Sequence, residues 1–501
     1  MLKQAALFVV VALCSSLIVQ AQPVLTPKNV ALGGGGSTYI TDYNANFYNP
    51  ANLFISDRIR NFDFGLAITG TYFNGVQNFS GLDDQRSNLQ DYLYAYKPGS
   101  YGITATERND IVADNYIRNR TTSLHQTRLE GTLLGLKFRN EKRAISLAIR
   151  NRTASSFEVG RGWYSTVLQE SESDMVLDRT LIHRYQSMYE ISVGYAESFR
   201  FFTDMTPRLD ELTFGIAPKL VLAGPYQEAI WQNKYVENSD GSYSLIQNFE
   251  FRSTGSFSEA LEQYWAGVPI ETALTNSISD NVFDVQGYGA GVDIGLTYLI
   301  TLGSDLSTIS TDQRTRKSLR FSFSITDIGF VNYDESPTEL IIGLDTAAAS
   351  LPTNLSNESF VGAPGQFLSF VVNHGASNPL TETTLQSGSK QVLLPTAIHG
   401  GILFEINRLK LMGDLSVGLT NNAYNSTKLV ASAGVELRPL PFLPLRAGTQ
   451  LATELPSFFS FGTGIETKFW DISIATQFVS RTFSDNPTLS GVTVAVLQFH
   501  L

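Results

Sequence analysis

The chain has 501 residues, of which only 17% are charged, and it carries a formal net charge of −11. A nucleic-acid-binding domain usually needs a basic surface, so the acidic balance argues against that class. The aromatic content of 11% argues against a disordered chain, and the mean hydropathy of −0.03 argues against a bundle of transmembrane helices. Low charge together with many aromatic residues and 40 glycines is typical of a membrane β-barrel, whose strands alternate apolar and polar residues.

The first 21 residues have the pattern of a secretory signal peptide. Lys3 precedes a short apolar core that ends at Leu13, and small residues favour cleavage after Ala21. A signal anchor is disfavoured because polar residues interrupt the apolar run, and a lipoprotein is disfavoured because Leu13 is a poor neighbour for Cys14, the only cysteine. We therefore expect three regions: a signal peptide at 1–21, an N-terminal segment at 22–58 and a barrel at 59–501.

Beyond the leader, short runs alternate between apolar and polar residues, as strands with two different faces do. The clearest run spans Gly287–Tyr298, where Tyr, Ala, Val, Ile and Leu alternate with glycines, Asp293 and Thr297. Most runs have about the length that a tilted strand needs to cross a bilayer. Fourteen strands are predicted in this way: 62–73, 128–138, 143–153, 188–198, 211–223, 286–300, 318–330, 397–407, 409–419, 428–438, 444–452, 457–467, 469–479 and 491–501.

The connections between the first eight runs alternate in length. Long connections are expected at 74–127, 154–187, 224–285 and 331–396, with shorter ones between them. This alternation is typical of outer-membrane barrels, which have long extracellular loops and short periplasmic turns. One long loop contains a helical pattern at 256–277, interpreted as a short amphipathic helix that packs on the barrel mouth or receives an apolar ligand.

The two faces of the predicted strands differ in chemistry. Leu134, Phe321, Leu411 and Phe461 are placed outward, towards lipid, where charges would cost about 2–4 kcal/mol each. A β-sandwich is disfavoured because the runs lack matched apolar interiors. The charged network inside either braces the barrel or lines a narrow polar conduit. The residues placed inward are Arg150, Arg152, Lys219, Asp293, Arg320, Glu405, Asp414, Glu436, Arg446, Glu466 and Asp471.

No arrangement of residues typical of catalysis is present in the sequence. The five histidines are not spaced as metal ligands, and neither an HExxH pair nor a GxSxG nucleophile motif occurs. The four-glycine run Gly33–Gly36 lacks the Gly-Lys-Ser/Thr ending of a phosphate-binding loop. We therefore expect no enzyme activity, no cofactor and no metal site.

The N-terminal segment contains the most specific motif of the chain. Gly33, Gly34, Gly35 and Gly36 are followed by Tyr-Asn-Pro-Ala at 48–51, in which Asn49, Pro50 and Ala51 form an NPA triplet. A glycine-rich turn and an NPA triplet after a signal peptide resemble the FadL-like superfamily of outer-membrane barrels, the long-chain fatty acid transporters. The runs 287–298 and 318–331 resemble a narrower group of uncharacterised Bacteroidota outer-membrane proteins related to the PorV barrel of type IX secretion.

The resemblance implies a 14-stranded barrel with residues 22–58 as a hatch inside it. It implies passive transport of hydrophobic small molecules without a cofactor, or, in PorV-like members, the binding of secreted or surface proteins. The ending Phe499-His500-Leu501 departs from the family's usual terminal aromatic residue. An apolar pocket of several hundred Å³ at the hatch would favour transport, whereas a lumen filled with paired charges would argue against it.

Overall fold

The computed structural model of the 501-residue chain describes most of the predicted barrel. The predicted signal peptide and most of the predicted helix at 256–277 lie outside the described residues. These residues are 25–55, 61–74, 121–140, 142–171, 174–201, 210–254, 285–301, 317–333, 338–351, 383–386, 390–425, 427–452, 457–480 and 488–500, with single residues between 106 and 116 and between 258 and 276.

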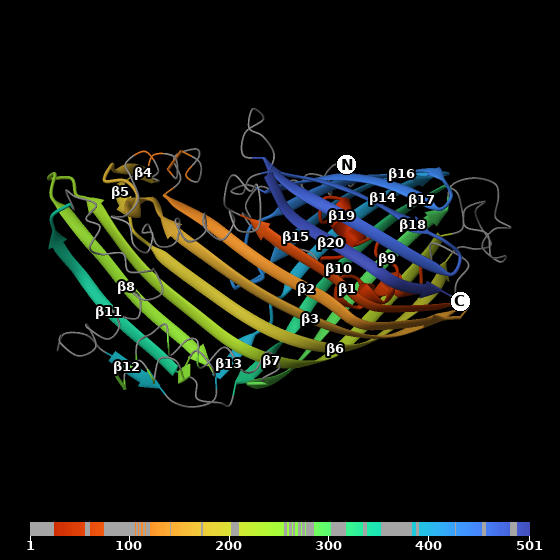
Figure 1. Cartoon of the computed structure of the whole chain (residues 1–501), viewed down its shortest axis with the longest axis horizontal. Helices are drawn as coiled ribbons and strands as arrows, with labels where there is room; N and C mark the ends of the chain where they lie inside the picture. Colours follow the sequence, from red (N-terminus) through yellow and green to blue (C-terminus); the bar gives the residue numbers. More distant parts are fainter. Residues whose placement is uncertain are drawn as a thin grey trace.

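Fourteen antiparallel strands close into a barrel, because each pairs with the next and the last, β20, pairs with the first, β1 (Figure 1). Each of the fourteen predicted runs coincides with one of these strands, so the predicted fold class is confirmed. The strands are β1 Phe62–Asn74, β2 Thr122–Arg139, β3 Arg143–Gly160, β6 Leu181–Phe201, β7 Asp210–Glu237, β9 Gly287–Thr301, β10 Lys317–Tyr333, β14 Ala397–Ile406, β15 Leu409–Gly418, β16 Val430–Leu440, β17 Leu443–Ala452, β18 Ser457–Glu466, β19 Trp470–Ser480 and β20 Thr488–His500.

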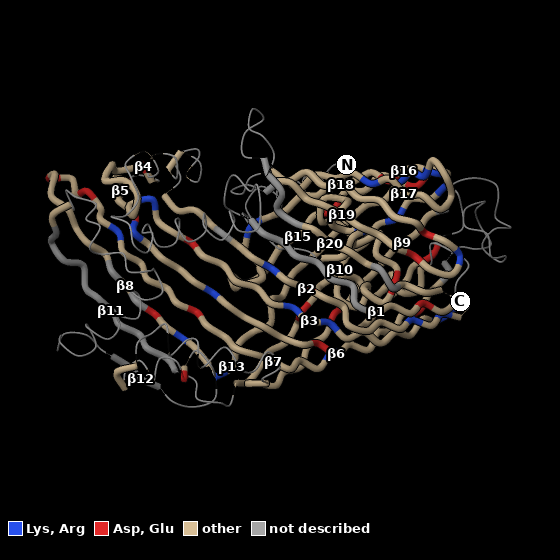
Figure 2. The backbone as a smooth tube through the Cα atoms, viewed as in Figure 1, with Lys and Arg blue, Asp and Glu red and all other residues tan. Residues whose placement is uncertain are grey.

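The outer surface of the barrel is apolar and its interior is polar. Phe321, Leu411 and Phe461 are exposed on the outside, while charged residues such as Arg150 and Glu190 are buried. Figure 2 marks the positions of charged residues along the strands. A closed antiparallel barrel of this kind is the architecture of outer-membrane proteins, whose short turns face the periplasm. The chain is an outer-membrane β-barrel, and we call its two ends periplasmic and outer on this basis. Among the described residues, no helix has the length and apolar character needed to cross a bilayer.

Several strands continue beyond the barrel at its outer end, where the sequence predicts long loops (left in Figure 1). β7 pairs with β9 up to Ala223 and with β8 from Tyr226 onwards. The prediction of loops throughout 224–285 and 331–396 is therefore wrong, because strands outside a membrane need no apolar outward row and escape a search for alternation. The additional strands are β4 Gln169–Ser171, β5 Asp174–Asp178, β8 Tyr243–Thr254, β11 Thr338–Ala349, β12 Thr383–Gln386 and β13 Lys390–Leu393.

Candidate functional site

Residues 25–55 lie in the lumen and, except for Lys28, are buried; we call them the hatch. The hatch contains a short helix, α2 (Pro27–Ala31), and two 3₁₀ turns, η1 (Tyr43–Phe47) and η2 (Pro50–Leu53). Thr26, Asp42 and Asn49 cap them, each accepting a hydrogen bond from a backbone N–H of its own turn. Such caps satisfy N–H groups that a short helix leaves without an internal partner.

Glycines on nine strands form the surface on which the hatch rests. A Cβ atom on Gly448 would lie 2.2 Å from the carbonyl carbon of Leu32, and one on Gly215 would lie 2.2 Å from the nitrogen of Ala51. No side chain fits at these distances, so the hatch can approach the wall this closely only where the wall has glycine. The other wall glycines against the hatch are Gly65, Gly135, Gly194, Gly295, Gly401, Gly434 and Gly462.

The NPA triplet forms the corner at which the hatch meets β9. The side-chain oxygen of Asn49 accepts a hydrogen bond from the Ala51 N–H at 3.2 Å. The Asn49 amide donates to the carbonyl of Ser37 at 2.8 Å and to the hydroxyl of Thr297 at 3.0 Å. Pro50 takes the first position of η2, where its missing N–H has no bond to lose. The triplet thus connects two parts of the hatch to each other and to the wall.

The glycine run lets the hatch pass close to β15 and β17. Gly33 and Gly34 have φ values of 79° and 83°, which residues with a side chain rarely adopt. A Cβ on Gly33 would also lie 2.3 Å from the carbonyl oxygen of Thr449. Directly after the run, the N–H of Ser37 donates to Asp414 at 2.9 Å, and the Ser37 hydroxyl donates to the same carboxylate.

Tyr39 of the hatch lies among charged residues of β16, β17 and β18. Its hydroxyl donates to Glu436, which also accepts a 2.7 Å hydrogen bond from Arg446. Arg446 pairs in turn with Glu466, which accepts a 2.6 Å hydrogen bond from Arg438. Burial raises the pKa of Tyr39 well above its usual value, so the hydroxyl remains protonated and able to donate.

A second group of charges lies nearer the middle of the lumen. The Glu190 carboxylate pairs with Arg150 and Arg152, the latter at 2.8 Å. Lys219 lies 2.8 Å from Asp293 and also pairs with Asp327. Three cations and three carboxylates make the group formally neutral, as buried charges require. This central charge cluster consists of Arg150, Arg152, Glu190, Lys219, Asp293 and Asp327.

A β-bulge in β10 brings Asp327 into the central charge cluster. The register between β9 and β10 shifts between Ile325 and Ile328, and Asp327 has φ of 57°. Simple alternation would place Asp327 outward beside Ile325, but the bulge turns it inward, where Arg152 donates two hydrogen bonds of 3.0 Å to it. The sequence contains no signal for this irregularity, so alternation alone misses Asp327.

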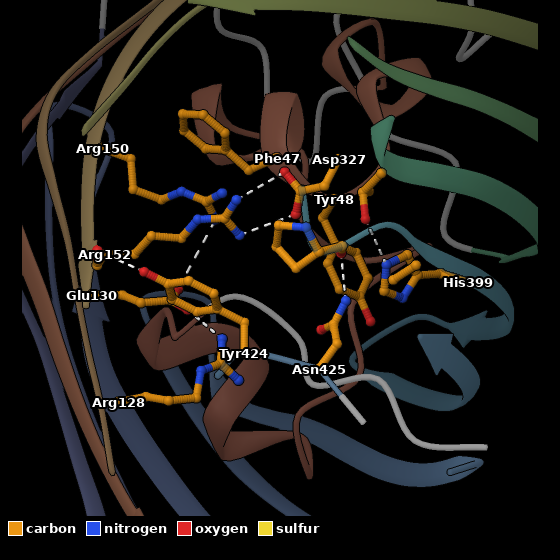
Figure 3. Close-up of a pocket in the computed structure, with 13 residues that line it drawn as sticks. Phe47, Tyr48, Arg128, Glu130, Arg150, Arg152, Asp327, His399, Tyr424 and Asn425 are labelled. Carbon is orange, nitrogen blue, oxygen red and sulfur yellow. Dashed lines mark hydrogen bonds and ion pairs between the residues drawn. The ribbon is translucent and has the colours of Figure 1, made fainter. Parts of the chain in front are cut away.

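The contacts between the hatch and the central cluster run through aromatic rings and a small cavity. The guanidinium of Arg150 lies 4.1 Å from the ring centre of Phe47, a cation–π contact. A cavity of about 20 Å³ lies between Tyr48, Arg152 and His399 (Figure 3). This volume holds about one water molecule. The apolar pocket expected at the hatch is thus not formed by the described residues there. The lumen at this level is filled with paired charges, which argues against transport while the hatch is seated.

An apolar layer covers the central charge cluster on its outer side. Several of its residues lie a few positions from the cluster on the same strands: Met188 precedes Glu190 by two residues on β6, and Val331 follows Asp327 by four on β10. The layer contains Ala154, Met188, Val221, Ala223, Val331, Tyr333, Leu394, Ala423 and Tyr424.

Above the apolar layer is a larger cavity of about 330 Å³, which we call the outer cavity. Strands β6, β7 and β8 provide Arg184, Glu228 and Arg252, which form a ladder of ion pairs at 3.0 and 3.3 Å. β13 and the loop after β15 provide the opposite wall. The remaining lining residues are Tyr185, Gln186, Tyr226, Lys390, Gln391, Val392, Leu393, Thr420, Asn421, Asn422 and Ala423.

The hatch also contacts the seam where the first and last strands meet. The ring of Tyr43 occupies the space beside Gly65 of β1, and its hydroxyl accepts a 3.2 Å hydrogen bond from Gln498 of β20. His500, also on β20, lies 2.6 Å from Asp63 of β1 and 2.9 Å from Asp471 of β19. The departure from a terminal aromatic residue thus coincides with a polar side chain that contacts both neighbouring strands.

The structure divides the charged residues placed inward from the sequence into separate groups. Arg150, Arg152 and Asp293 belong to the central charge cluster, and Glu436, Arg446 and Glu466 surround Tyr39. Asp414 binds Ser37, and Arg320 pairs with Glu405 at 3.4 Å. The sequence reasoning missed Glu190, although it is two residues from Met188 on the same inward face. It also missed Tyr424, because a loop has no periodicity to indicate where its side chains point. No group of three or more His, Cys, Asp or Glu among the described residues could hold a metal ion.

Several solved structures of other proteins are similar to this chain over most of its length at low sequence identity. It is similar to the toluene transporter TodX of Pseudomonas putida, with 12% identity, TM-score 0.41 and coverage of 97% of this chain and 99% of TodX. It is similar to the toluene transporter TbuX of Ralstonia pickettii, with 13% identity, TM-score 0.40 and coverage of 95% and 98%. A FadL homologue of Pseudomonas aeruginosa gives 12% identity, TM-score 0.39 and coverage of 97% and 99%.

No curated protein sequence matches the chain. Residues 60–476, which include most of the barrel, match the family described as a family of unknown function (DUF5723). The match covers more than half of the chain and begins immediately after the hatch. The protein therefore belongs to the DUF5723 family.

Proposed function

We propose that the protein is a passive outer-membrane transporter for hydrophobic small molecules and that its path is opened by displacement of the hatch. The observation that carries this proposal is the width of the barrel together with its insert. A barrel of about eight strands is filled by its own side chains, whereas a wider one encloses a cavity or a channel. The lumen of a 14-stranded barrel is closed only when an additional segment fills it. A hatch that fills the periplasmic side of the lumen fits a barrel through which molecules pass.

The distribution of ion pairs supports a hatch that moves within a stable wall. In the central charge cluster, Arg150 pairs with Glu190, and Lys219 pairs with Asp293, all four on barrel strands. These pairs remain together when the hatch shifts, so displacement leaves no isolated charge there. By contrast, the hatch binds the wall mainly through hydrogen bonds of single side chains, such as that from Asn49 to Thr297. Each such hydrogen bond stabilises the seated hatch by about 0.5–1.5 kcal/mol.

The apolar layer supports a hydrophobic cargo. A molecule that leaves the outer cavity must pass Met188, Val221, Tyr333 and Leu394 before it reaches the charges. An apolar molecule loses no hydrogen bonds in this layer, whereas a polar one must give up hydration. The alternative role suggested by PorV, a docking scaffold for secreted or surface proteins, stays a prediction.

Uptake by cells tests the proposal. Cells that produce the protein are compared with cells that lack it, using labelled toluene, a labelled long-chain fatty acid and labelled sucrose. We expect faster uptake of at least one apolar compound and no change for sucrose. Equal uptake of both apolar compounds in the two strains, with the barrel present in the outer membrane, would contradict the proposal.

A further inference from the structure

The loop between β15 and β16 enters the lumen from the outer end. Residues 419–425 of this loop, the inward loop, have their own internal support: the Asn422 side chain accepts hydrogen bonds from the N–H groups of Tyr424 at 2.8 Å and Asn425 at 2.7 Å. Asx turns of this kind fix a loop's shape. The inward loop is therefore a built element that presents Tyr424 at its tip.

Tyr424 reaches across the barrel to the opposite wall. Its hydroxyl lies 2.9 Å from the carbonyl oxygen of Arg152 on β3 and 2.8 Å from that of Gln186 on β6. The guanidinium of Arg152 also lies 4.8 Å from the centre of the Tyr424 ring. The side chain is only 1% exposed. Burial raises its pKa well above the usual value, so the hydroxyl keeps its proton and donates to these carbonyls.

The inward loop separates the two cavities of the lumen. Thr420 to Ala423 line the outer cavity, whereas Tyr424 and Asn425 line the small cavity above the hatch. Figure 3 shows the Tyr424 ring close to Arg152 and Glu130, on the side of the small cavity. The Tyr424 ring is therefore one of the side chains that separate the outer cavity from the space beside the hatch.

We propose that Tyr424 is a specificity-determining residue of the transport path, an outer gate whose ring decides which solutes pass from the outer cavity to the hatch. The inference rests on the proposed transport function and deepens it. The gate is held independently of the hatch, because its hydrogen bonds run to β2, β3, β6 and the chain just before β14.

The contacts that hold the gate can be exchanged without leaving a charge unpaired. Besides the Tyr424 hydroxyl, the loop is held by the Gln126 amide, which donates to the carbonyl of Ala423 at 2.7 Å, and by Asn425, which donates to the carbonyl of Pro395. These are neutral hydrogen bonds, which water can replace. Arg152 loses a cation–π contact when the ring leaves, but it keeps its pairs with Glu190 and Asp327.

Thiol labelling tests the gate without any need for transport. Ala397 lines the small cavity and is buried, so Ala397→Cys places a thiol just beyond the gate. The natural chain has one cysteine, Cys14 in the predicted signal peptide, so the new thiol is alone in the barrel. Intact cells are treated with a charged, membrane-impermeant methanethiosulfonate reagent, and the labelling rate is measured in the Ala397→Cys background with the gate intact, with Tyr424→Ala and with Tyr424→Phe.

We expect labelling at least about tenfold faster with Tyr424→Ala, because the path is then open. With Tyr424→Phe, which keeps the ring, we expect labelling to be about threefold faster, because the loss of one hydrogen bond raises the fraction of molecules in which the gate is open. Gln126→Ala should also accelerate labelling, because it frees the loop while Tyr424 is kept. Tyr288→Ala is the matched control, since Tyr288 is 59% exposed on the outer wall.

Equal labelling rates in all variants would overturn the gate and leave the transport proposal standing on its uptake test. Faster labelling without uptake of any apolar compound would show that Tyr424 closes the path to the small cavity, but would overturn both the transport proposal and the role of Tyr424 in specificity. Assembly is checked by the heat-dependent gel mobility of the barrel. If Tyr424→Ala does not assemble, the rates with Tyr424→Phe and Gln126→Ala decide.

Discussion

The two halves of the lumen are closed in different ways. On the periplasmic side, the hatch rests against glycines of nine strands; three of these glycines lie against its backbone and the others against its side chains. On the outer side, a cavity of about 330 Å³ is separated from the interior by the inward loop, with Tyr424 reaching the far wall. A seal made of many close contacts tolerates the loss of one side chain but not the gain of one in the wall. A seal made by one side chain is instead lost when that side chain is removed.

The gain of a side chain in the hatch seat should have the largest effect. In Gly448→Val, the added Cβ would lie 2.2 Å from the backbone of Leu32, and neither segment can move without breaking strand pairing or the hatch. Overpacking of this kind costs about 1–3 kcal/mol or more. We expect the hatch to be expelled, with high conductance in planar bilayers and rapid proteolysis at the N-terminal segment.

The matched control is Gly413→Val on β15, two strands from β17, where the nearest atom is 3.7 Å from an added Cβ. This variant should conduct as little as the natural protein. A closed, protease-resistant barrel with Gly448→Val would show that the seat does not depend on its glycines.

Loss of a wall charge should weaken the barrel while leaving the hatch in place. In Glu190→Gln, Arg150, Arg152 and Lys219 lose a shared carboxylate that is fully buried. Removing one partner from buried ion pairs costs about 3–5 kcal/mol, although Arg152 and Lys219 keep their pairs with Asp327 and Asp293. We expect a clear fall in the temperature at which gel mobility changes, with conductance unchanged at lower temperature.

Glu197→Gln is the comparison, because Glu197 pairs with Arg143 at an exposed position on the same strand. Its unfolding temperature should stay near that of the natural protein. Equal unfolding temperatures for the two variants would show that the central charge cluster stabilises the wall no more than an exposed ion pair does.

Loosening of the hatch corner should have the smallest effect of the three. Pro50→Gly removes the fixed φ at the start of η2. The displaced hatch gains conformational entropy as a result, which favours displacement by about 1 kcal/mol. We expect a severalfold higher leak of small dyes, with assembly intact. Pro439→Gly, at an exposed position on β16, controls for the substitution itself. Unchanged leakage with Pro50→Gly would mean that the corner does not limit opening.

The wall of this protein could be predicted from the sequence, whereas much of its filling could not. Each barrel strand faces lipid on one side and water or the hatch on the other. Its residues must therefore alternate between apolar and polar, so all fourteen barrel strands could be located from the sequence. β8 and β11 lie beyond the membrane and lack this constraint. Asp327 turns inward through a bulge, and Tyr424 reaches the lumen from a loop. Both positions depend on contacts with residues far away in the chain, which a local pattern does not contain.

The position of Tyr43 has a consequence for how the protein is made. The strand that follows the hatch, β1, is synthesised early and must wait for β20, the last strand, before the wall can close. Tyr43 contacts Gly65 on the early strand and Gln498 on the late one, so it joins both only when the hatch is already seated. A chain with an empty or misfilled interior lacks this contact at the moment of closure. We therefore expect a correctly seated hatch to stabilise the closed seam between β1 and β20.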